Sequence, residues 1–287
     1  MQNKTGLPTV DIGIACYSMQ ASEWWTGVLS NLLAENKETI DVNRIRKASS
    51  MMPDRNKNTA IYKKRDSLTD SNRVEVVEGF MEEGGADWLF FIDDDTVPPP
   101  GAISKLISLN RSFVSGMYFL PQPPFSPVAY FRRENGQYSA IREYADDSMF
   151  PVDAVGLGCA LIHRSVFTKI MEEHQVFRRG TGSTFAVHNS QVKNVKSFPE
   201  NQKKPYIKNG WYHEPVLPVS PNEMDLPFPM FALEYGRTED MYFCELCANV
   251  GIRPYLDTSI ICEHWKMKPA TLADYKRELD AEKRAMK

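Results

Sequence analysis

Short apolar segments alternate with amphipathic segments along most of this chain, and no other feature constrains the fold as strongly. The apolar segments that we expect to be strands are residues 9–17, 87–92, 112–117 and 254–262. The segments between them carry apolar residues at helical spacing. Strands that alternate with helices are typical of an α/β protein. We therefore expect a mostly parallel, mixed central sheet that is flanked by helices.

One of these strands runs directly into three aspartates, Asp93, Asp94 and Asp95, which three prolines follow shortly after. If the strand continues, Asp93 and Asp95 point the same way, because successive side chains alternate. Two carboxylates about 6 Å apart repel by roughly 3 kcal/mol at an effective dielectric constant of about 20. The cluster alone leaves two interpretations open: a solvated turn that caps the next helix, or an oxygen site for Mg²⁺ or Mn²⁺. Open α/β sheets bind ligands at this end of their strands.

Two further segments carry polar groups to the ends of expected elements. The sequence RTED at residues 237–240 opens a helix with Glu239 and Asp240, and His264 ends the last apolar strand. Acidic residues are common at a helix N-terminus because they interact favourably with the helix dipole, so a structural role is open too. A carboxylate pair, a helix start and an imidazole at a strand end can surround one site.

The order of these features resembles glycosyltransferases of the GT-A fold, especially glycosyltransferase family 2 and its relatives. The segments that carry the resemblance are VDIGIACYS, IDDDT (the Asp-x-Asp motif), VDAVGLGCALIHRSVF (a Gly-x-Gly segment), GRTEDMYFCELCANVG and IICEHW, between residues 9 and 265. The resemblance implies a GT-A (Rossmann-like) fold. It also implies a single catalytic domain over residues 1–265, followed by a charged helical tail over residues 266–287.

The resemblance implies a nucleoside-diphosphate sugar as donor, with UDP the commonest nucleotide among relatives. Mn²⁺ or Mg²⁺ would be held by Asp95 and His264, with Asp93 on the metal, directly or through water, or on the ribose. The other residues expected to bind the donor are Ala15, Cys16 and Tyr17 around the base, Arg73, Asp94, Gly156, Gly158 and Trp265. For the glycines a bulged strand is an alternative interpretation, and for Trp265 simple packing against the sheet is the favoured one.

For catalysis, the resemblance assigns Asp240 as the base that takes the proton of the acceptor hydroxyl, with Glu239 orienting the sugar or the acceptor. One base acting directly on the acceptor implies inversion at the anomeric carbon. Two features depart from the family pattern. The Arg-Asn pair of the family is reversed here as Asn72-Arg73, and residues 175–235 form a long, irregular segment that we interpret as a lid or acceptor segment.

Several alternatives remain open at this stage. Basic stretches at residues 44–65 and 193–208 suit a polyanionic acceptor, so a phage-type enzyme that glycosylates hydroxymethylated DNA bases is one alternative. A non-catalytic module that binds sugar or nucleic acid and a nucleotide-sugar hydrolase are two others. Cys244, Cys247, Cys262 and His264 have zinc-like ligand types, although the first two fit a buried helix face.

Composition sets the remaining limits. The chain has 287 residues, 42% of them hydrophobic, and a net charge of −3, which gives no global attraction to nucleic acid or membrane. We find no apolar stretch long enough to span a bilayer and no signal peptide, so we expect no stable membrane insertion. Five scattered cysteines indicate a reduced, cytoplasmic compartment.

Overall fold

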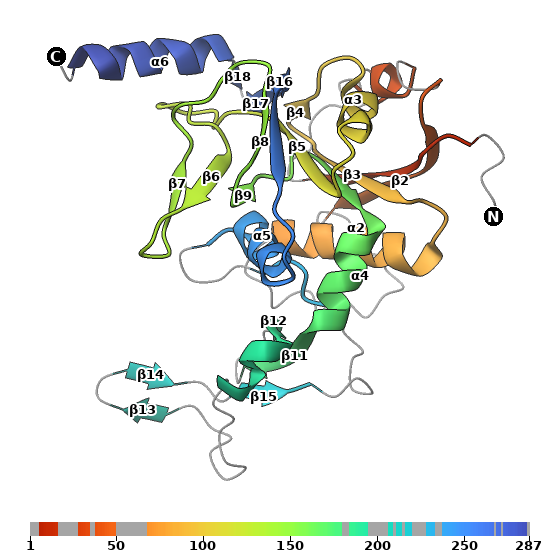
Figure 1. The fold of residues 1–287 in the computed structure, drawn as a ribbon, viewed down its shortest axis with the longest axis vertical. Coiled ribbons are helices and arrows are strands. Elements are labelled where there is room, and N and C mark those ends of the chain that lie inside the picture. The colour runs from red at the N-terminus through yellow and green to blue at the C-terminus, as the bar shows by residue number, and fades with distance from the viewer. Residues whose placement is uncertain are drawn as a thin grey trace.

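A seven-stranded mixed sheet forms the centre of the molecule (Figure 1), in the order β2-β1-β3-β10-β5-β16-β8. The structure, a computed structural model, describes residues 6–16, 28–34, 38–49, 68–179, 184–194, 206–208, 211–213, 216–219, 228–232, 237–266, 268–270 and 272–285. The strands of this sheet are β1 (Thr9–Cys16), β2 (Asp41–Ser49), β3 (Trp88–Asp93), β5 (Phe113–Met117), β8 (Met149–Pro151), β10 (Cys159–His163) and β16 (Tyr255–Ile261). Only β10 and β8 run antiparallel to their neighbours. The expected α/β fold with a mostly parallel, mixed sheet is confirmed.

The apolar sequence of β3 reflects its place inside the sheet, where both of its faces are buried. Leu89 and Phe91 belong to a core cluster that includes buried side chains of α2 (Leu68–Glu83), α4 (Arg164–Glu173) and α5 (Glu239–Asn249). Phe90 and Ile92 face the opposite way, into a cluster with α3 (Ala102–Ser108) and the helical residues 28–34. A strand buried on both faces reads as a continuous apolar run, as this one does.

Two small sheets border the carboxyl ends of the central strands. One has the order β18-β17-β4, and the other has the order β7-β6-β9. Their strands are β4 (Thr96–Val97), β17 (Glu263–Lys266), β18 (Lys268–Ala270), β6 (Ala129–Arg132), β7 (Tyr138–Ala140) and β9 (Ala154–Val155). Because β17 pairs with β4, the segment after the aspartates is tied to the segment that carries His264.

The interpretation of residues 175–235 as irregular is wrong for the parts that the structure describes, which include several short strands. A three-stranded sheet has the order β12-β11-β15, and β13 pairs with β14. The bounds are β11 (His174–Arg179), β12 (Thr184–His188), β13 (Tyr206–Lys208), β14 (Trp211–His213) and β15 (Val216–Pro218). Figure 1 shows these strands at the end of the molecule opposite α6. The strands are only three to six residues long, which hid them in a sequence rich in Pro, Asn and Lys.

The charged C-terminal segment forms the helix α6 (Leu272–Ala285), but this helix does not face solvent all round. Tyr275 is 5% exposed, and its ring stacks on Phe119 at 5.0 Å between centroids. Leu272 and Leu279 pack against the same core. None of the helices in the described part of the chain is both long enough and apolar enough to cross a bilayer.

Candidate active site at the carboxyl ends of the central strands

The aspartates after β3 point toward different partners. β3 ends at Asp93, and Asp94 and Asp95 lie in a turn, so the expectation that Asp93 and Asp95 point the same way is wrong. Asp93 keeps the strand alternation of Leu89 and Phe91 and faces α2. There, Arg73 Nη2 lies 2.9 Å from Asp93 Oδ1. The ion pair is buried, since 1% of the Arg73 side chain and 12% of the Asp93 side chain are exposed.

Arg73 also reaches the first turn of α5. Its Nε lies 3.4 Å from Asp240 Oδ1 and 3.9 Å from Glu239 Oε1. The side chain of Thr238 caps this helix by accepting a hydrogen bond from the N–H of Met241, which fixes where the two acids begin the helix. The structure therefore gathers three carboxylates around one guanidinium, although the order Asn72-Arg73 is reversed relative to the family.

One buried cation does not fully compensate these carboxylates. Burial raises the pKa of Asp93 to about 6 against the opposing effect of Arg73, and the carboxylates of Asp95 and Glu239 raise it further. Burial raises the pKa of Asp240 to about 8, again against Arg73, with Glu239 and Asp93 adding to the rise. The backbone N–H of Leu157 donates a hydrogen bond to Asp240 and lowers this pKa. Asp240 is thus more basic than an ordinary aspartate.

We expect Asp240→Asn to stabilise the ligand-free protein, and by more as the pH rises. The folded-state pKa of about 8 lies above the ordinary 3.8, so folding favours the protonated acid. The free energy of unfolding therefore decreases as the pH rises from about 4 to about 8. Asparagine does not ionise and escapes this loss. One pKa unit corresponds to about 1.4 kcal/mol, so a gain of at least this size is expected near pH 8. Thermal unfolding in EDTA at about pH 5, 7 and 9 measures it, and a variant less stable than the parent at the highest pH would contradict the expectation.

Asp95 faces His264, the residue that ends the last apolar segment. The two side chains are buried, and Asp95 Oδ2 lies 3.2 Å from His264 Nε2. Their backbones are joined as well, because the N–H of Trp265 donates to the carbonyl of Asp95 at 2.6 Å. The pairing of β17 with β4 sets His264 opposite Thr96. Two residues that are 169 positions apart in the chain therefore meet through the geometry of a small sheet.

The hydrogen bonds of His264 place a proton on the ring nitrogen that faces away from Asp95. Nδ1 lies 2.8 Å from the carbonyl oxygen of Phe119, and a carbonyl only accepts, so Nδ1 carries the proton. In the neutral imidazole, Nε2 then directs its lone pair toward the carboxylate of Asp95. Metal-binding histidines are held in this way, with the far ring nitrogen donating to a backbone carbonyl. The pair therefore fits two ligands of one cation.

A metal site made entirely by protein groups is not present in the part of the chain that the structure describes. No group of three or more His, Cys, Asp or Glu side chains is arranged there to hold an ion. Asp93, which we expected on the metal, faces Arg73 instead. Mg²⁺ is commonly bound through one or two carboxylates together with substrate phosphates, so two protein ligands suit an ion that arrives with a phosphorylated substrate.

Gly158 borders Asp93, Gly156 lies against Tyr118, and side chains of the protein approach both glycines closely. A Cβ on Gly156 would lie 1.9 Å from the hydroxyl oxygen of Tyr118. One on Gly158 would lie 2.9 Å from Thr96 Oγ1 and 3.0 Å from Asp93 Oδ2. The N–H of Gly158 donates to the Tyr118 hydroxyl at 3.2 Å, and the Tyr118 ring contacts His264 edge-on at 5.5 Å. Sequence reasoning missed Tyr118, which follows directly after β5 and links the glycines to His264.

Gly156→Ala should destabilise the protein by about 1–3 kcal/mol, because the added methyl group overlaps the Tyr118 hydroxyl. In a Tyr118→Phe background the cost should be smaller, since the overlapping oxygen is gone. The recovery should be partial, because Val128 Cγ1 lies 2.7 Å from the same position. Urea unfolding of both single variants and the double variant measures the coupling. An equal cost of Gly156→Ala in both backgrounds would argue against this packing.

Of the other residues that we expected to bind the donor, the structure brings only some to the site. Ala15 pairs in register with Asp93, so the end of β1 borders the site, and Cys16 is the last residue of β1. Tyr17 lies outside the described residues. Asp94 is fully buried in the turn. Trp265 alternates with His264 on β17, is 37% exposed, and donates from Nε1 to Glu263 at 2.9 Å. It therefore faces away from Asp93, Asp95, Glu239 and Asp240, which we call the acidic cluster.

Two described arginines of the first basic stretch, Arg44 and Arg46, are engaged in ion pairs. Arg46 pairs with the buried Asp11 at 2.7 Å and with Glu83 at 3.3 Å, and Arg44 pairs with Glu83 at 2.7 Å. Residues 51–67 lie outside the described part of the chain.

The zinc interpretation is wrong because the cysteines lie in different layers. Cys244 and Cys247 belong to the core cluster on the α5 side of the sheet, whereas Cys262 belongs to the cluster on the α3 side. All three thiols are buried. Burial raises the thiol pKa of each of them, which disfavours the thiolate that zinc requires.

No protein-family profile and no curated protein matches the chain. Solved structures similar to it include the A197 protein from STIV, with a TM-score of 0.42 and 14% identity over 91% of this chain and 86% of that one. Another is a glycosyltransferase involved in the glycosylation of the major capsid of PBCV-1, with a TM-score of 0.28 and 10% identity over 56% and 62%. A third is GalNAc-T7 with UDP, GalNAc and Mn²⁺, with a TM-score of 0.40 and 9% identity over 97% and 48%. All three TM-scores are below 0.5, so we base the functional proposal on the site and on the sequence motifs.

Proposed function

We propose that this protein is a metal-dependent glycosyltransferase that moves a sugar from a nucleoside-diphosphate donor to an acceptor hydroxyl with inversion. The observation that carries the proposal is the convergence of two groups at one end of the sheet. One is the Asp95–His264 pair, in which His264 Nε2 lies 3.2 Å from a carboxylate oxygen of Asp95. The other is the set of carboxylates around Arg73, which includes Asp240, a group more basic than an ordinary aspartate. A module that only binds sugar has no need of such a base beside a cation site.

Asp95 and His264 would hold Mn²⁺ or Mg²⁺. Such an ion, when bound, neutralises the negative charge that the diphosphate gains as it leaves. Both side chains are buried, His264 is held by the carbonyl of Phe119, and the backbone of Asp95 is bonded to Trp265, so the pair is arranged before the substrate binds. Asp93 is held by Arg73 beside the end of β1, a place from which its carboxylate can reach a ribose.

Asp240 is the proposed base. In the transfer step, an acceptor hydroxyl oxygen forms a bond to the anomeric carbon, and the bond from that carbon to the diphosphate oxygen breaks. The electron pair of the broken bond leaves with the diphosphate, and the hydroxyl proton passes to a carboxylate oxygen of Asp240. Of the Asp240 side chain, 16% is exposed, so the group is accessible while most of it is shielded. Arg73 and the N–H of Leu157 hold the carboxylate in position.

The donor is proposed to be a UDP-sugar, with Ala15 and Cys16 at the end of β1 beside the nucleotide base, whereas Asp94 is fully buried and has no exposed surface for the sugar. Gly158 would border the diphosphate, since its Cβ position lies 3.0 Å from Asp93 Oδ2. Glu239, which lies next to the base and is 9% exposed, would orient the sugar or the acceptor. DNA as acceptor gains no support from Arg44 and Arg46, because both are engaged in ion pairs.

Product analysis tests the proposal. The full chain is incubated with Mn²⁺, a panel of nucleotide sugars and candidate acceptors, including simple glycosides and hydroxymethylated DNA, and the products are identified by mass spectrometry. We expect one nucleotide sugar to give an acceptor heavier by one sugar residue, together with free nucleoside diphosphate. Release of diphosphate with free sugar and no modified acceptor would instead indicate a hydrolase. Binding of donors without any turnover would indicate a non-catalytic module.

A further inference from the structure

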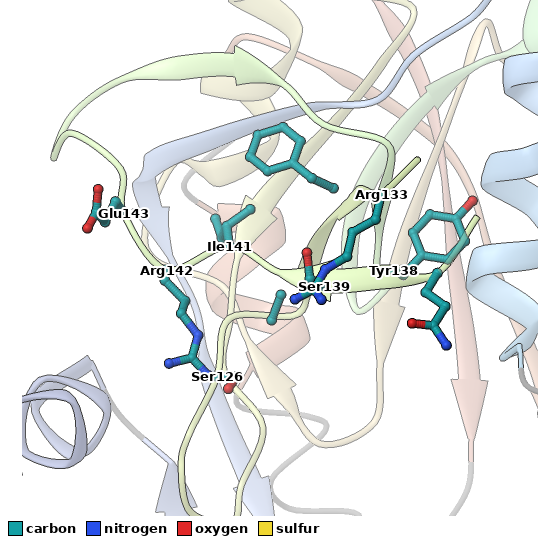
Figure 2. A pocket seen from close by; sticks show the side chains of 10 residues that line it. Ser126, Arg133, Tyr138, Ser139, Ile141, Arg142 and Glu143 are labelled. Carbon is teal, nitrogen blue, oxygen red and sulfur yellow. The ribbon is translucent and has the colours of Figure 1, made fainter. Parts of the chain in front are cut away.

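A hollow lies against the hairpin of β6 and β7, and none of the acidic groups described above lines it (Figure 2). Its volume is about 600 Å³, within the usual range of small-molecule sites. Figure 2 shows Arg133 and Arg142 at two sides of this hollow, with Ser139 and Ile141 between them in the view. Phe131 and Ser126 also line it. We call this hollow the hairpin pocket.

The hairpin pocket and the acidic cluster lie on opposite faces of β6. Phe131 pairs with Ser139 across the hairpin, and both line the pocket together with Arg133. Tyr130 and Arg132 alternate with these residues and point the other way. Tyr130 packs against the core cluster that includes α5, the helix that carries Asp240. The pocket is therefore a separate site, and a ligand bound in it does not touch Asp240.

Three features of the pocket define the chemistry of a ligand. The ring of Phe131 is 40% exposed, which is a large exposed apolar surface for a residue within a strand. The guanidinium of Arg133 makes no ion pair or hydrogen bond with the described residues, so it is available to a carboxylate or phosphate. The hydroxyl of Ser139 and the amide of Gln137 add neutral hydrogen-bonding groups. An aromatic face, neutral hydrogen-bonding groups and a guanidinium suit a ring that carries hydroxyl groups and one anionic substituent.

The local charge argues against an extended polyanion. Glu134 and Glu143 lie on the same segment as Arg133 and Arg142, and Asp146 and Asp147 follow closely. A polynucleotide gains its affinity from several cations that contact successive phosphates. The segment has no such excess of positive charge, whereas a single anionic group needs only one or two guanidinium groups.

We propose that the hairpin pocket binds an anionic saccharide, with the anionic group on Arg133 and the sugar ring against Phe131. The proposal does not rest on the glycosyltransferase function, because it concerns residues on the other face of the hairpin. Phosphorylated sugars and uronic acids share the required chemistry, and binding measurements separate them.

Isothermal titration of the full chain in EDTA tests the proposal with four probes: glucose 6-phosphate, glucuronate, glucose and a short single-stranded oligonucleotide. We expect glucose 6-phosphate or glucuronate to bind at least about tenfold more tightly than glucose, since a charge-assisted hydrogen bond contributes this much. Arg133→Gln and Phe131→Ala should each weaken this binding by about tenfold or more. Arg132→Gln removes the same charge from the adjacent residue on the opposite face and should leave the affinity unchanged.

Asp95→Ala should also leave the affinity unchanged, because that residue belongs to the acidic cluster. Four results would overturn the proposal: no binding of either anionic sugar, equal binding to Arg133→Gln, tighter binding of the oligonucleotide, or loss of binding in Asp95→Ala. The last result would assign the sugar to the acidic cluster. Sugar transfer is measured separately, so failure of this proposal and failure of the transferase proposal are distinguishable.

Discussion

Replacing Asp240 by asparagine is expected to lower the rate of sugar transfer by about 10²- to 10⁴-fold, the usual contribution of a positioned general base. Asparagine keeps the shape of the side chain and can still accept the hydrogen bond from the N–H of Leu157, but it cannot take a proton. The donor contacts involve other residues, so the Kd for the nucleotide sugar should change by no more than about twofold. Single-turnover product analysis gives the rate, and isothermal titration with Mn²⁺ gives the affinity.

Two controls separate this loss of activity from loss of structure. The variant is expected to be more stable than the parent in the absence of ligands, so unfolding cannot account for a lower rate. Asp153→Asn makes the same chemical change at a half-buried residue whose carboxylate pairs with Arg253 at 2.9 Å, and it should retain full activity. Full activity in Asp240→Asn would remove Asp240 as the base and leave Glu239, its neighbour in the same turn, as the next candidate.

The elements that carry the site could be predicted because their signals are local. Four apolar residues of β3, Leu89 to Ile92, are buried on the two faces of the sheet, so an uninterrupted apolar run predicts a central strand. The start of α5 could be predicted because Thr238 is a favourable cap and two acids follow it. The position of acidic residues at the carboxyl end of a strand also predicts which end of the sheet carries the candidate site.

The pairing of side chains within the site could be predicted only in part. The family resemblance places Asp95 and His264 side by side, and the two side chains do meet at 3.2 Å. The pairing of β4 with β17 that brings them together leaves no local pattern in the sequence. The sequence order Asn72-Arg73 likewise does not show that Arg73 spans from α2 to both Asp93 and Asp240. The hydroxyl of Tyr118 that occupies the space beside Gly156 is a third such contact.

Asp95→Ala is expected to abolish the thermal stabilisation that Mn²⁺ and a nucleoside diphosphate together give the protein. A ligand present at about 100 times its Kd stabilises the folded state by about 2.7 kcal/mol, which raises the Tm of a chain of this size by roughly 5 °C. In the parent this rise should require both components, because Asp95 and His264 supply only two ligands and the diphosphate must complete the coordination. Differential scanning fluorimetry with Mn²⁺ alone, diphosphate alone and both together measures the shift.

His264→Ala should remove the same stabilisation, and the double variant should lose no more than either single variant, since both side chains are proposed to bind one ion. Asp153 lies far from Asp95 and His264 in sequence and pairs with Arg253, so Asp153→Ala should keep the full shift. A full shift in Asp95→Ala would mean that the diphosphate binds elsewhere. The short approach of Asp95 to His264 would then be explained by a protonated histidine that donates from Nε2 to the carboxylate, a purely structural ion pair.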